Sequence, residues 1–251
     1  MSDLNTLKLY LEEELKTLDL PENPTNLYEP IRYILTLGGK RIRPVLVLMA
    51  CDLFAGDYKK AISAAKAIEL FHNFSLMHDD IMDDAPLRRG KTTVHEKWNE
   101  HVAILSGDAM LICAYKELLK SEGNTTSLVE IFNNVALEVC EGQMLDMNFE
   151  TRFDVHVDEY LHMISQKTAI LLSGALRIGA LIGKASPTDV EQLGIFGKKL
   201  GIAFQLRDDL LDVYADQSQF GKQVGGDILS NKKTYLLLKA LEQAQGDDLT
   251  T

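Results

Sequence analysis

Two groups of aspartates share one spacing and lie in otherwise apolar stretches of the sequence. The first occupies residues 79–83 in LMHDDIMDD, and the second occupies residues 208–212 in FQLRDDLLDV. On a helix, the first and last aspartates of each pattern lie about 40° apart around the axis, so they project side by side. Unpaired carboxylates there would repel one another and lose hydration, whereas a bound hard cation such as Mg²⁺ removes both costs. The predicted metal ligands are Asp79, Asp80, Asp83, Asp208, Asp209 and Asp212.

Basic residues recur in turn-rich places beside the apolar segments. The stretch GGKRIRP places Lys40, Arg41 and Arg43 after a glycine turn, and LRRGK places Arg88 and Arg89 after the first aspartates. Mg²⁺ held by carboxylates usually takes phosphate oxygens as further ligands, and arginine offers forked donors to such oxygens. Singly, each base fits an ordinary surface position, but together they indicate recognition of two anions. The further members of this set are Lys167, Thr168, Lys222 and Lys232.

Apolar residues recur at helical spacing along most of the chain. We expect helices at about residues 2–18, 24–37, 44–54, 58–84, 99–120, 125–149, 157–183 and 187–215, and from 234 onward. Asn23 before Pro24 and Ser186 before Pro187 are the expected helix caps. Residues 86–90 are expected to form a loop, and no strand is predicted. The pattern predicts one all-α domain of roughly ten helices over residues 1–251.

Composition narrows the function classes. The chain has 251 residues, of which 46% are hydrophobic, and a net charge of −11, which argues against double-stranded nucleic acid as a partner. The three cysteines lie in apolar helical segments and are expected to be buried, reduced thiols. The N-terminus is polar and acidic, and the longest apolar run, residues 169–183, is too short to span a membrane. We therefore expect a soluble, cytoplasmic protein without stable membrane insertion.

Five motifs follow one another in the order of a known family. They are GGKRIRP, the first aspartate pattern followed by RRG, the pair KT at 167–168, FQLRDDLLD, and a loop with GK and later KKT. With these motifs the chain resembles the trans-isoprenyl diphosphate synthases, or polyprenyl synthetases, over essentially its whole length. The resemblance implies an all-α isoprenoid synthase fold around a central cavity, usually in a homodimer, and a short-chain type such as farnesyl or geranylgeranyl diphosphate synthase. Such proteins usually continue further, so C-terminal helices are expected to be missing.

The resemblance also implies roles for single residues. The first aspartate pattern would bind two Mg²⁺ ions that bridge an allylic diphosphate (dimethylallyl, geranyl or farnesyl), and Asp208, with its neighbours, would bind a third. Isopentenyl diphosphate would be held by Lys40, Arg43, His72 and Arg89. The allylic diphosphate would be contacted by Arg88, Lys167, Thr168, Gln205, Lys222 and Lys232. Leu236 stands where the family often has proline, so Lys232 and Lys233 both remain candidates for the last contact.

The implied reaction joins the two substrates after the allylic C–O bond ionises. Cationic groups would neutralise the departing diphosphate, and an apolar cavity would exclude water. The expected catalytic groups are Asp79, Asp80, Asp83, Arg88, Lys167 and Asp208. Phe74 and Ser75 precede Asp79 by five and four positions, where the family uses bulk to stop chain growth. Phe74 predicts a C15 or C20 product, with ordinary core packing as the alternative, and the sequence does not fix the length within C10 to C25.

Three other functions fit parts of the sequence. A di-iron bundle uses Glu-x-x-His pairs, which occur at residues 69–72 and 159–162, but it leaves both aspartate patterns unexplained. A terpene cyclase also ionises an allylic diphosphate, but it needs no second diphosphate site of the kind that Lys40, Arg43 and His72 indicate. A non-catalytic partner subunit would be expected to lose one acidic motif, and both are intact.

Overall fold

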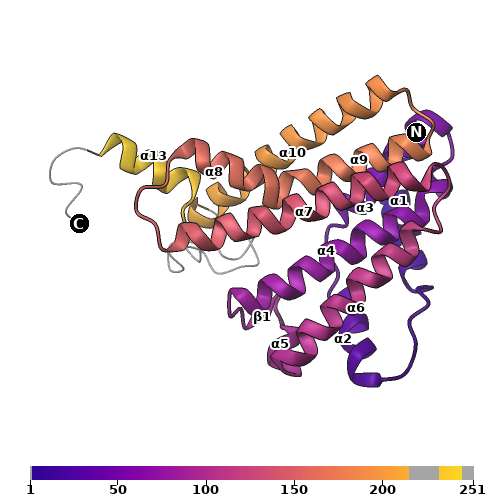
Figure 1. The fold of residues 1–251 in the computed structure, drawn as a ribbon, viewed down its shortest axis with the longest axis horizontal. Helices are drawn as coiled ribbons and strands as arrows, with labels where there is room; N and C mark the ends of the chain where they lie inside the picture. The colour runs from indigo at the N-terminus through magenta and orange to yellow at the C-terminus, as the bar shows by residue number, and fades with distance from the viewer. Residues whose placement is uncertain (1, 215–231, 245–251) are drawn as a thin grey trace. The chain divides into compact units, whose positions relative to one another are not determined.

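A computed structural model describes residues 2–214 and 232–244 of the chain. Helices dominate these residues (Figure 1), and the described strands form a single short hairpin, so the all-α fold class is confirmed. The elements are α1 (Leu4–Leu15), α2 (Thr25–Thr36), α3 (Ile42–Ala55), the 3₁₀ turn η1 (Tyr58–Ala61), α4 (Ile62–Met82), β1 (Leu87–Arg88), β2 (Lys91–Thr92), α5 (Val94–Lys97), α6 (Glu100–Leu118), α7 (Thr125–Glu150), α8 (Val157–Ile164), the π-helical turn η2 (Ser165–Ala169), α9 (Ile170–Ile182), α10 (Pro187–Tyr214) and α13 (Tyr235–Gln243).

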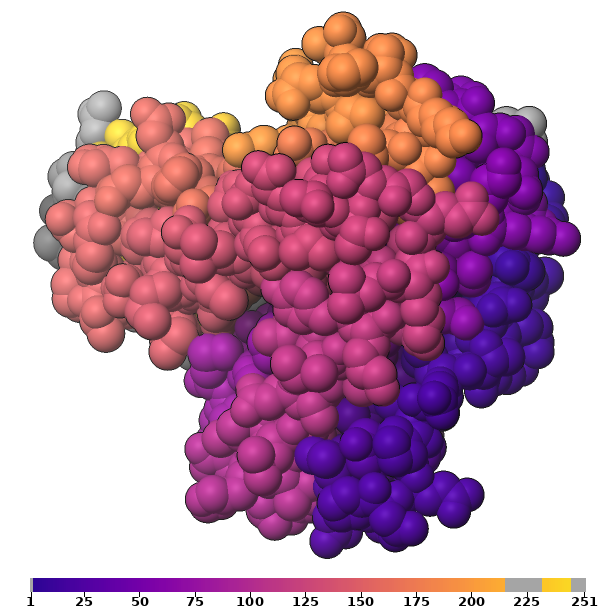
Figure 2. Space-filling model, turned by 45° about the vertical axis from the view of Figure 1, so that its right-hand side comes forward, coloured from indigo at the N-terminus to yellow at the C-terminus, as the bar shows by residue number. Residues whose placement is uncertain are grey.

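The chain forms two compact units, and the division falls within α7, α9 and α10. The first unit contains residues 1–133 and 174–194. In it α4 packs along α6, and α3 packs on α4 (Figure 1). Figure 2 shows α2, in indigo, against α6, in magenta. Residues 64–71 of α4 are buried on every side of the helix, which is typical of a helix at the centre of a core.

The second unit contains residues 134–173 and 195–251. Its described core joins α8 to the end of α7 and to α13, with Phe149, Met163 and Leu238 buried together. A Cβ atom on Gly142 would lie 2.7 Å from the Cα of Lys167, so only glycine lets α7 approach the π-helical turn this closely. Such turns are often found at functional sites, and this one carries Lys167.

Three local expectations were wrong. The carbonyl of Pro24 accepts from the amide of Leu27, so Pro24 rather than Asn23 is the N-cap of α2, without a side-chain hydrogen bond. The loop expected at residues 86–90 is a two-stranded hairpin whose turn residues, Arg89 and Gly90, both have positive φ. The expected helix at 157–183 is interrupted by η2. Ser186 is confirmed as a cap, because its Oγ accepts from the amide of Asp189 at 3.2 Å.

The cysteines also differ from expectation. All three are free thiols, but Cys51 alone among them is buried, while Cys113 is half-buried and Cys140 is exposed. Their helices are amphipathic, so an apolar segment does not by itself place every position in the core. Within the described residues, no helix has the length and apolar character needed to cross a membrane.

Candidate functional site

The first aspartate pattern lies at the C-terminal end of α4. Asp79 is half-buried in the last turn, and Asp83 is the exposed C-cap residue. The carbonyl groups at this end of a helix carry partial negative charge, which disfavours carboxylates and favours a nearby cation. Since Asp79 and Asp83 are four residues apart, their side chains project from the same side of the helix. This arrangement supplies two oxygen ligands where positive charge is most stabilised.

Asp80, between Asp79 and Asp83, pairs with an arginine of the hairpin. It is buried, and Arg88 donates from Nε to both of its carboxylate oxygens at 2.8 Å and forms an ion pair from Nη2 at 2.6 Å. Burial raises the pKa of Asp80, and the hydrogen bonds from Arg88 oppose that rise. In the structure the carboxylate of Asp80, a predicted metal ligand, holds Arg88 in place.

A second cluster surrounds His72 in the first unit. Arg43 approaches the Nε2 atom of His72 at 3.1 Å, and Arg89 donates to the carbonyl of Gly38. Among the described residues neither arginine forms an ion pair, although Arg41 pairs with buried Glu69. Gly39 permits the approach of Arg89, because a Cβ there would lie 3.0 Å from the guanidinium carbon. The charge of Glu69 also acts on Arg43 and Arg89, but one carboxylate does not balance three guanidinium groups, so this cluster keeps a surplus of positive charge, which suits an anion.

The imidazole of His72 is neutral in this cluster. Burial lowers its pKa well below 6.5, and the charges of Arg43, Arg89, Arg88 and Arg41 lower it further. Because an arginine can only donate, Nε2 of His72 accepts and the proton of the neutral ring is on Nδ1. Burial also lowers the pKa of Arg43, to about 10, which leaves that guanidinium charged at neutral pH.

The depressed pKa of His72 predicts a pH-dependent stability. Below pH 6.5 the unfolded chain binds a proton at this residue and the folded chain does not. The free energy of unfolding therefore decreases as the pH is lowered below 6.5. Denaturant unfolding at about pH 7.5 and about pH 5.5 should show this fall, and His72→Gln should reduce it. The matched control is the exposed residue His162→Gln, which should keep the wild-type difference. A pH dependence identical in His72→Gln and wild type would contradict the burial of a neutral imidazole.

The second aspartate pattern lies at the end of α10, where both Asp209 and Asp212 are buried, whereas Asp83 of the first pattern is exposed. Asp209 is buried and accepts from the hydroxyl of Tyr160, from Nε2 of Gln205 at 3.0 Å and from the amide of Tyr235 at 3.3 Å. Thr168 donates to Gln205 at 3.1 Å, which joins three predicted site residues in one chain of hydrogen bonds. Asp208 and Asp212 are four residues apart, so their side chains project from the same side of α10.

Two lysines meet at one carboxylate in the second unit. Nζ of Lys167 lies 2.6 Å from Oδ2 of Asp146, and Nζ of Lys232 lies 3.1 Å from the same oxygen and 2.9 Å from Glu150. Burial raises the pKa of Asp146, but the two lysines outweigh it and the pKa lies below 3.8. Lys233 instead lies over the ring of Phe153, so the structure places Lys232 in this cluster. Lys222 lies outside the described residues.

The sequence interpretation missed Asp146, Glu150, Tyr160 and Glu69. A usable signal existed for Asp146 and Glu150, which are four residues apart in an apolar segment, QMLDMNFE, as in the two aspartate patterns. Glu69 was noticed only as part of a Glu-x-x-His pair. It is paired with Arg41, and Glu159 of the other pair contacts Arg152 at 2.7 Å, which removes the basis for a di-iron centre.

The predicted chain-length residues lie in the middle of α4. The half-buried ring of Phe74 contacts the rings of Phe71, at 5.6 Å between centroids, and His78, at 4.7 Å. The hydroxyl of Ser75 donates to the carbonyl of His72 at 2.9 Å, so it is used within its own helix. Phe74 is thus fixed by aromatic contacts while part of its surface stays accessible.

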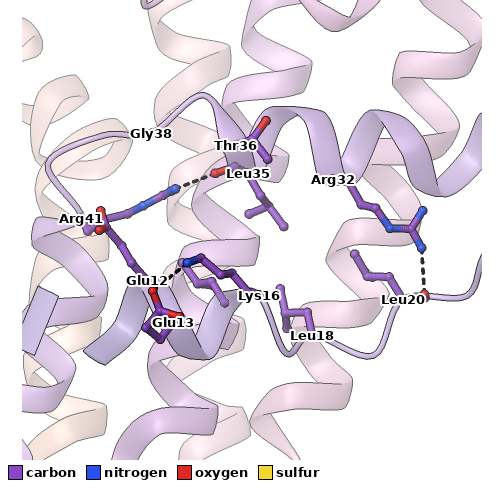
Figure 3. Close-up of a pocket in the computed structure, with 11 residues that line it drawn as sticks. Glu12, Glu13, Lys16, Leu18, Leu20, Arg32, Leu35, Thr36, Gly38 and Arg41 are labelled. Carbon is purple, nitrogen blue, oxygen red and sulfur yellow. Dashed lines mark hydrogen bonds and ion pairs between the residues drawn. The ribbon is translucent and has the colours of Figure 1, made fainter. Parts of the chain in front are cut away.

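A separate cleft of about 500 Å³ opens in the first unit between the end of α1, α2 and the glycine turn (Figure 3). At its edges Lys16 pairs with Glu13, Arg32 donates to the carbonyl of Leu20, and Arg41 donates to the carbonyl of Leu35. The cleft is therefore lined by charges that already have partners. None of the residues predicted to bind substrate is among its lining residues.

Comparisons with known proteins agree with the motifs. Residues 24–251 match the polyprenyl synthetase family. The chain is 41% identical to a short chain isoprenyl diphosphate synthase of Methanothermobacter thermautotrophicus, over 99% of this chain and 78% of that protein. It is also 41% identical to a geranylgeranyl diphosphate synthase of Saccharolobus solfataricus, over 96% of this chain and 76% of that protein.

Solved structures give the same answer. A crystal structure of a geranylgeranyl pyrophosphate synthase superposes with a TM-score of 0.93 at 51% identity and covers 96% of this chain and 74% of that one. The geranylgeranyl pyrophosphate synthetase of Pyrococcus horikoshii superposes with a TM-score of 0.92 at 38% identity, covering 98% and 77%. The resemblance seen in the motifs is confirmed: the chain belongs to the polyprenyl synthetase family and is a prenyltransferase of the short-chain type.

Proposed function

We propose that this prenyltransferase condenses isopentenyl diphosphate with an allylic diphosphate in a Mg²⁺-dependent reaction. The allylic substrate is dimethylallyl, geranyl or farnesyl diphosphate, and the products are pyrophosphate and a C15–C20 trans-prenyl diphosphate. The observation that carries the proposal is the charge around His72, where Arg43 and Arg89 have no carboxylate partner among the described residues. A second diphosphate needs such a site, and a cyclase does not.

The aspartates fit Mg²⁺ in their chemistry and placement. Each pattern ends a helix with a pair of carboxylates four residues apart, and its middle aspartate is held by protein donors. We assign metal binding, of up to three ions, to Asp79, Asp80, Asp83, Asp208, Asp209 and Asp212, with the pairs Asp79–Asp83 and Asp208–Asp212 each projecting from one side of a helix. Asp80 and Asp209 would also position their neighbours through their hydrogen bonds. When bound, Mg²⁺ supplies charge neutralisation of diphosphate oxygens.

The cationic side chains divide between the two substrates. Lys40, Arg43, His72 and Arg89 would bind isopentenyl diphosphate, with the neutral ring of His72 donating from Nδ1. Arg88, Lys167, Thr168, Gln205, Lys222 and Lys232 would contact the allylic diphosphate. Arg88 is oriented by Asp80, and both described lysines are oriented by Asp146. Charges held in place before the reaction cost little reorganisation when negative charge develops on the leaving group.

The reaction balances with these groups alone. The allylic C–O bond breaks, and its electron pair leaves with the diphosphate. The double bond of isopentenyl diphosphate then attacks the allylic carbon, a C–C bond forms, and one proton is lost from the isopentenyl unit to the released pyrophosphate. The role of the protein is to stabilise the departing charge and to keep water from the cation, so no nucleophilic serine or cysteine is required.

A direct assay tests the proposal. The protein is incubated with labelled isopentenyl diphosphate, Mg²⁺ and each of the three allylic starters, and the products are sized. We expect label in a C15–C20 product and none without Mg²⁺. Turnover of an allylic substrate to a hydrocarbon when isopentenyl diphosphate is omitted would support a cyclase instead. Absence of incorporation with every starter would refute the synthase assignment.

Phe74→Ala is expected to lengthen the product by at least one five-carbon unit. Loss of the ring removes bulk that contacts Phe71 and His78 beside the aspartates, so the chain can extend further. Chromatography of the dephosphorylated products measures the length. Phe204→Ala is the matched control, because it removes an exposed ring from α10 and should leave the length unchanged. The same product from wild type and Phe74→Ala would show that Phe74 is ordinary core.

We further propose that the enzyme is a homodimer. Leu105 and Ile112 of α6 and its C-cap Leu119 repeat every seven residues and are 60%, 60% and 57% exposed, an apolar stripe that no other described part of the chain covers. An apolar stripe of this kind suits the packing of a second copy. Sedimentation equilibrium measures the mass directly, and a monomer at assay concentrations would contradict the proposal.

A further inference from the structure

His95 is a buried imidazole for which the proposed reaction has no use. Its side chain is 9% exposed, and neither ring nitrogen has a hydrogen-bond partner in the described part of the chain. Buried polar groups nearly always have a partner, so this ring requires an explanation. Two carboxylates lie next to it: the ligand atoms of Asp84, His95 and Glu96 all lie within 4.8 Å of one another.

The hairpin brings these three residues together. Asp84 follows α4 in a left-handed conformation, with φ of 47°, at a position where glycine is usual. The amide of Ala85 donates back to the carbonyl of Asp80 at 2.9 Å, which closes the turn. Thr93 then donates to the carbonyl of Ala85 at 2.8 Å. The start and the end of the hairpin segment thus lie next to each other. Asp84 precedes this segment, and α5 follows it.

The distances suit a bound ion better than a hydrogen bond. Nε2 of His95 lies 3.8 Å from the nearest carboxylate oxygen of Glu96, which is too far for a hydrogen bond. Two ligands bound at about 2.1 Å with tetrahedral angles lie about 3.4 Å apart, so a small side-chain rotation would bring both onto one ion. One imidazole and two carboxylates favour a transition-metal ion, whereas Mg²⁺ prefers oxygen ligands alone.

We propose that Asp84, His95 and Glu96 form a site for a divalent transition-metal ion of the Zn²⁺ class, separate from the two aspartate pairs. Water completes the coordination, because residues 2–214 and 232–244 offer three ligands and both carboxylates are exposed. The hairpin between the ligands carries Arg88 and Arg89. An ion at its base ties the end of α4 to α5 and restricts the segment that presents both arginines.

Zn²⁺ binding in the presence of excess Mg²⁺ tests the proposal. Mg²⁺ occupies oxygen-only sites, and equilibrium dialysis then measures the Zn²⁺ that the protein retains. We expect one tightly bound equivalent, and Glu96→Gln and His95→Phe should each weaken it by more than the roughly 10- to 100-fold that loss of a ligand's supporting residue costs. Asp84→Asn should weaken Zn²⁺ binding to a similar extent. It should leave the turn intact, since asparagine tolerates the left-handed conformation. The matched control is Glu100→Gln, an exposed carboxylate at the start of α6, which should bind as wild type.

A second measurement uses Co²⁺ in place of Zn²⁺, because its visible absorption reports nitrogen and oxygen ligands directly. The spectrum should change in His95→Phe and persist in Asp79→Asn. Glu96 is exposed, so Glu96→Gln keeps its fold whatever happens to the variants of buried His95. Equal Zn²⁺ retention in wild type, Glu96→Gln and His95→Phe would overturn the proposal. Retention lost only in Asp79→Asn would also overturn it, since the ion would then belong to the aspartate pair.

Discussion

Replacing Asp79 with asparagine is expected to lower kcat/KM by about 100- to 1,000-fold, which is the usual cost of removing one group that stabilises transition-state charge. Asparagine has the same shape but no charge, so the pair with Asp83 would hold Mg²⁺ weakly. The folded state should not suffer, because Asp79 lies at the negative end of α4, where losing a carboxylate is neutral or favourable. Initial rates across a Mg²⁺ titration measure the loss, and thermal unfolding measures stability.

Asp80→Asn should behave differently, although it changes the neighbouring residue in the same way. Both oxygens of its buried carboxylate accept from Nε of Arg88. The substitution should therefore cost about 1.5–3 kcal/mol of folding stability and raise the KM for the allylic substrate. Asp108→Asn, an exposed carboxylate of α6, is the matched control and should leave both quantities unchanged. Wild-type activity of Asp79→Asn across the whole Mg²⁺ range would remove Asp79 from the metal site.

The helices and the aspartate pairs could be predicted because both depend on short-range spacing. Apolar residues at helical intervals locate a helix wherever one face is buried, and carboxylates four residues apart must share a side of it. The pairs Asp79–Asp83 and Asp208–Asp212 follow from that rule. The same rule also applies to Asp146 and Glu150 in QMLDMNFE, but this segment lacks the two adjacent aspartates that distinguish the other patterns.

The partners of the buried charges could not be predicted in this way. Asp146 meets Lys232 from 86 positions away, and Arg41 meets Glu69 from 28 positions away. Such pairs depend on how helices pack, and no local spacing encodes them. The hairpin was missed for a related reason: its turn requires positive φ at Arg89, which a non-glycine residue rarely adopts without tertiary contacts such as the one with Gly38.

Asp146→Asn is expected to lower the free energy of unfolding by about 2–3 kcal/mol and to raise the KM for the allylic substrate. One oxygen of this buried carboxylate holds both Lys167 and Lys232. Without its charge, two neighbouring ammonium groups repel each other and no longer share a fixed position. In the wild type the pKa of Asp146 lies below 3.8, so its contribution is complete at neutral pH and is lost only as the pH falls through that lowered value.

Two further substitutions on α7 separate this effect from a general loss of charge. Glu150→Gln removes a partner of Lys232 and leaves both lysines paired with Asp146, so its effects on stability and KM should be smaller than those of Asp146→Asn. Glu130→Gln removes an exposed carboxylate from the same helix and should match wild type. Denaturant unfolding gives the stability, and steady-state kinetics with the allylic substrate varied gives the KM. If Asp146→Asn unfolds at the wild-type denaturant concentration and keeps the wild-type KM, the lysines reach the diphosphate without the help of this carboxylate, and their position must be set by the π-helical turn and the chain around residue 232.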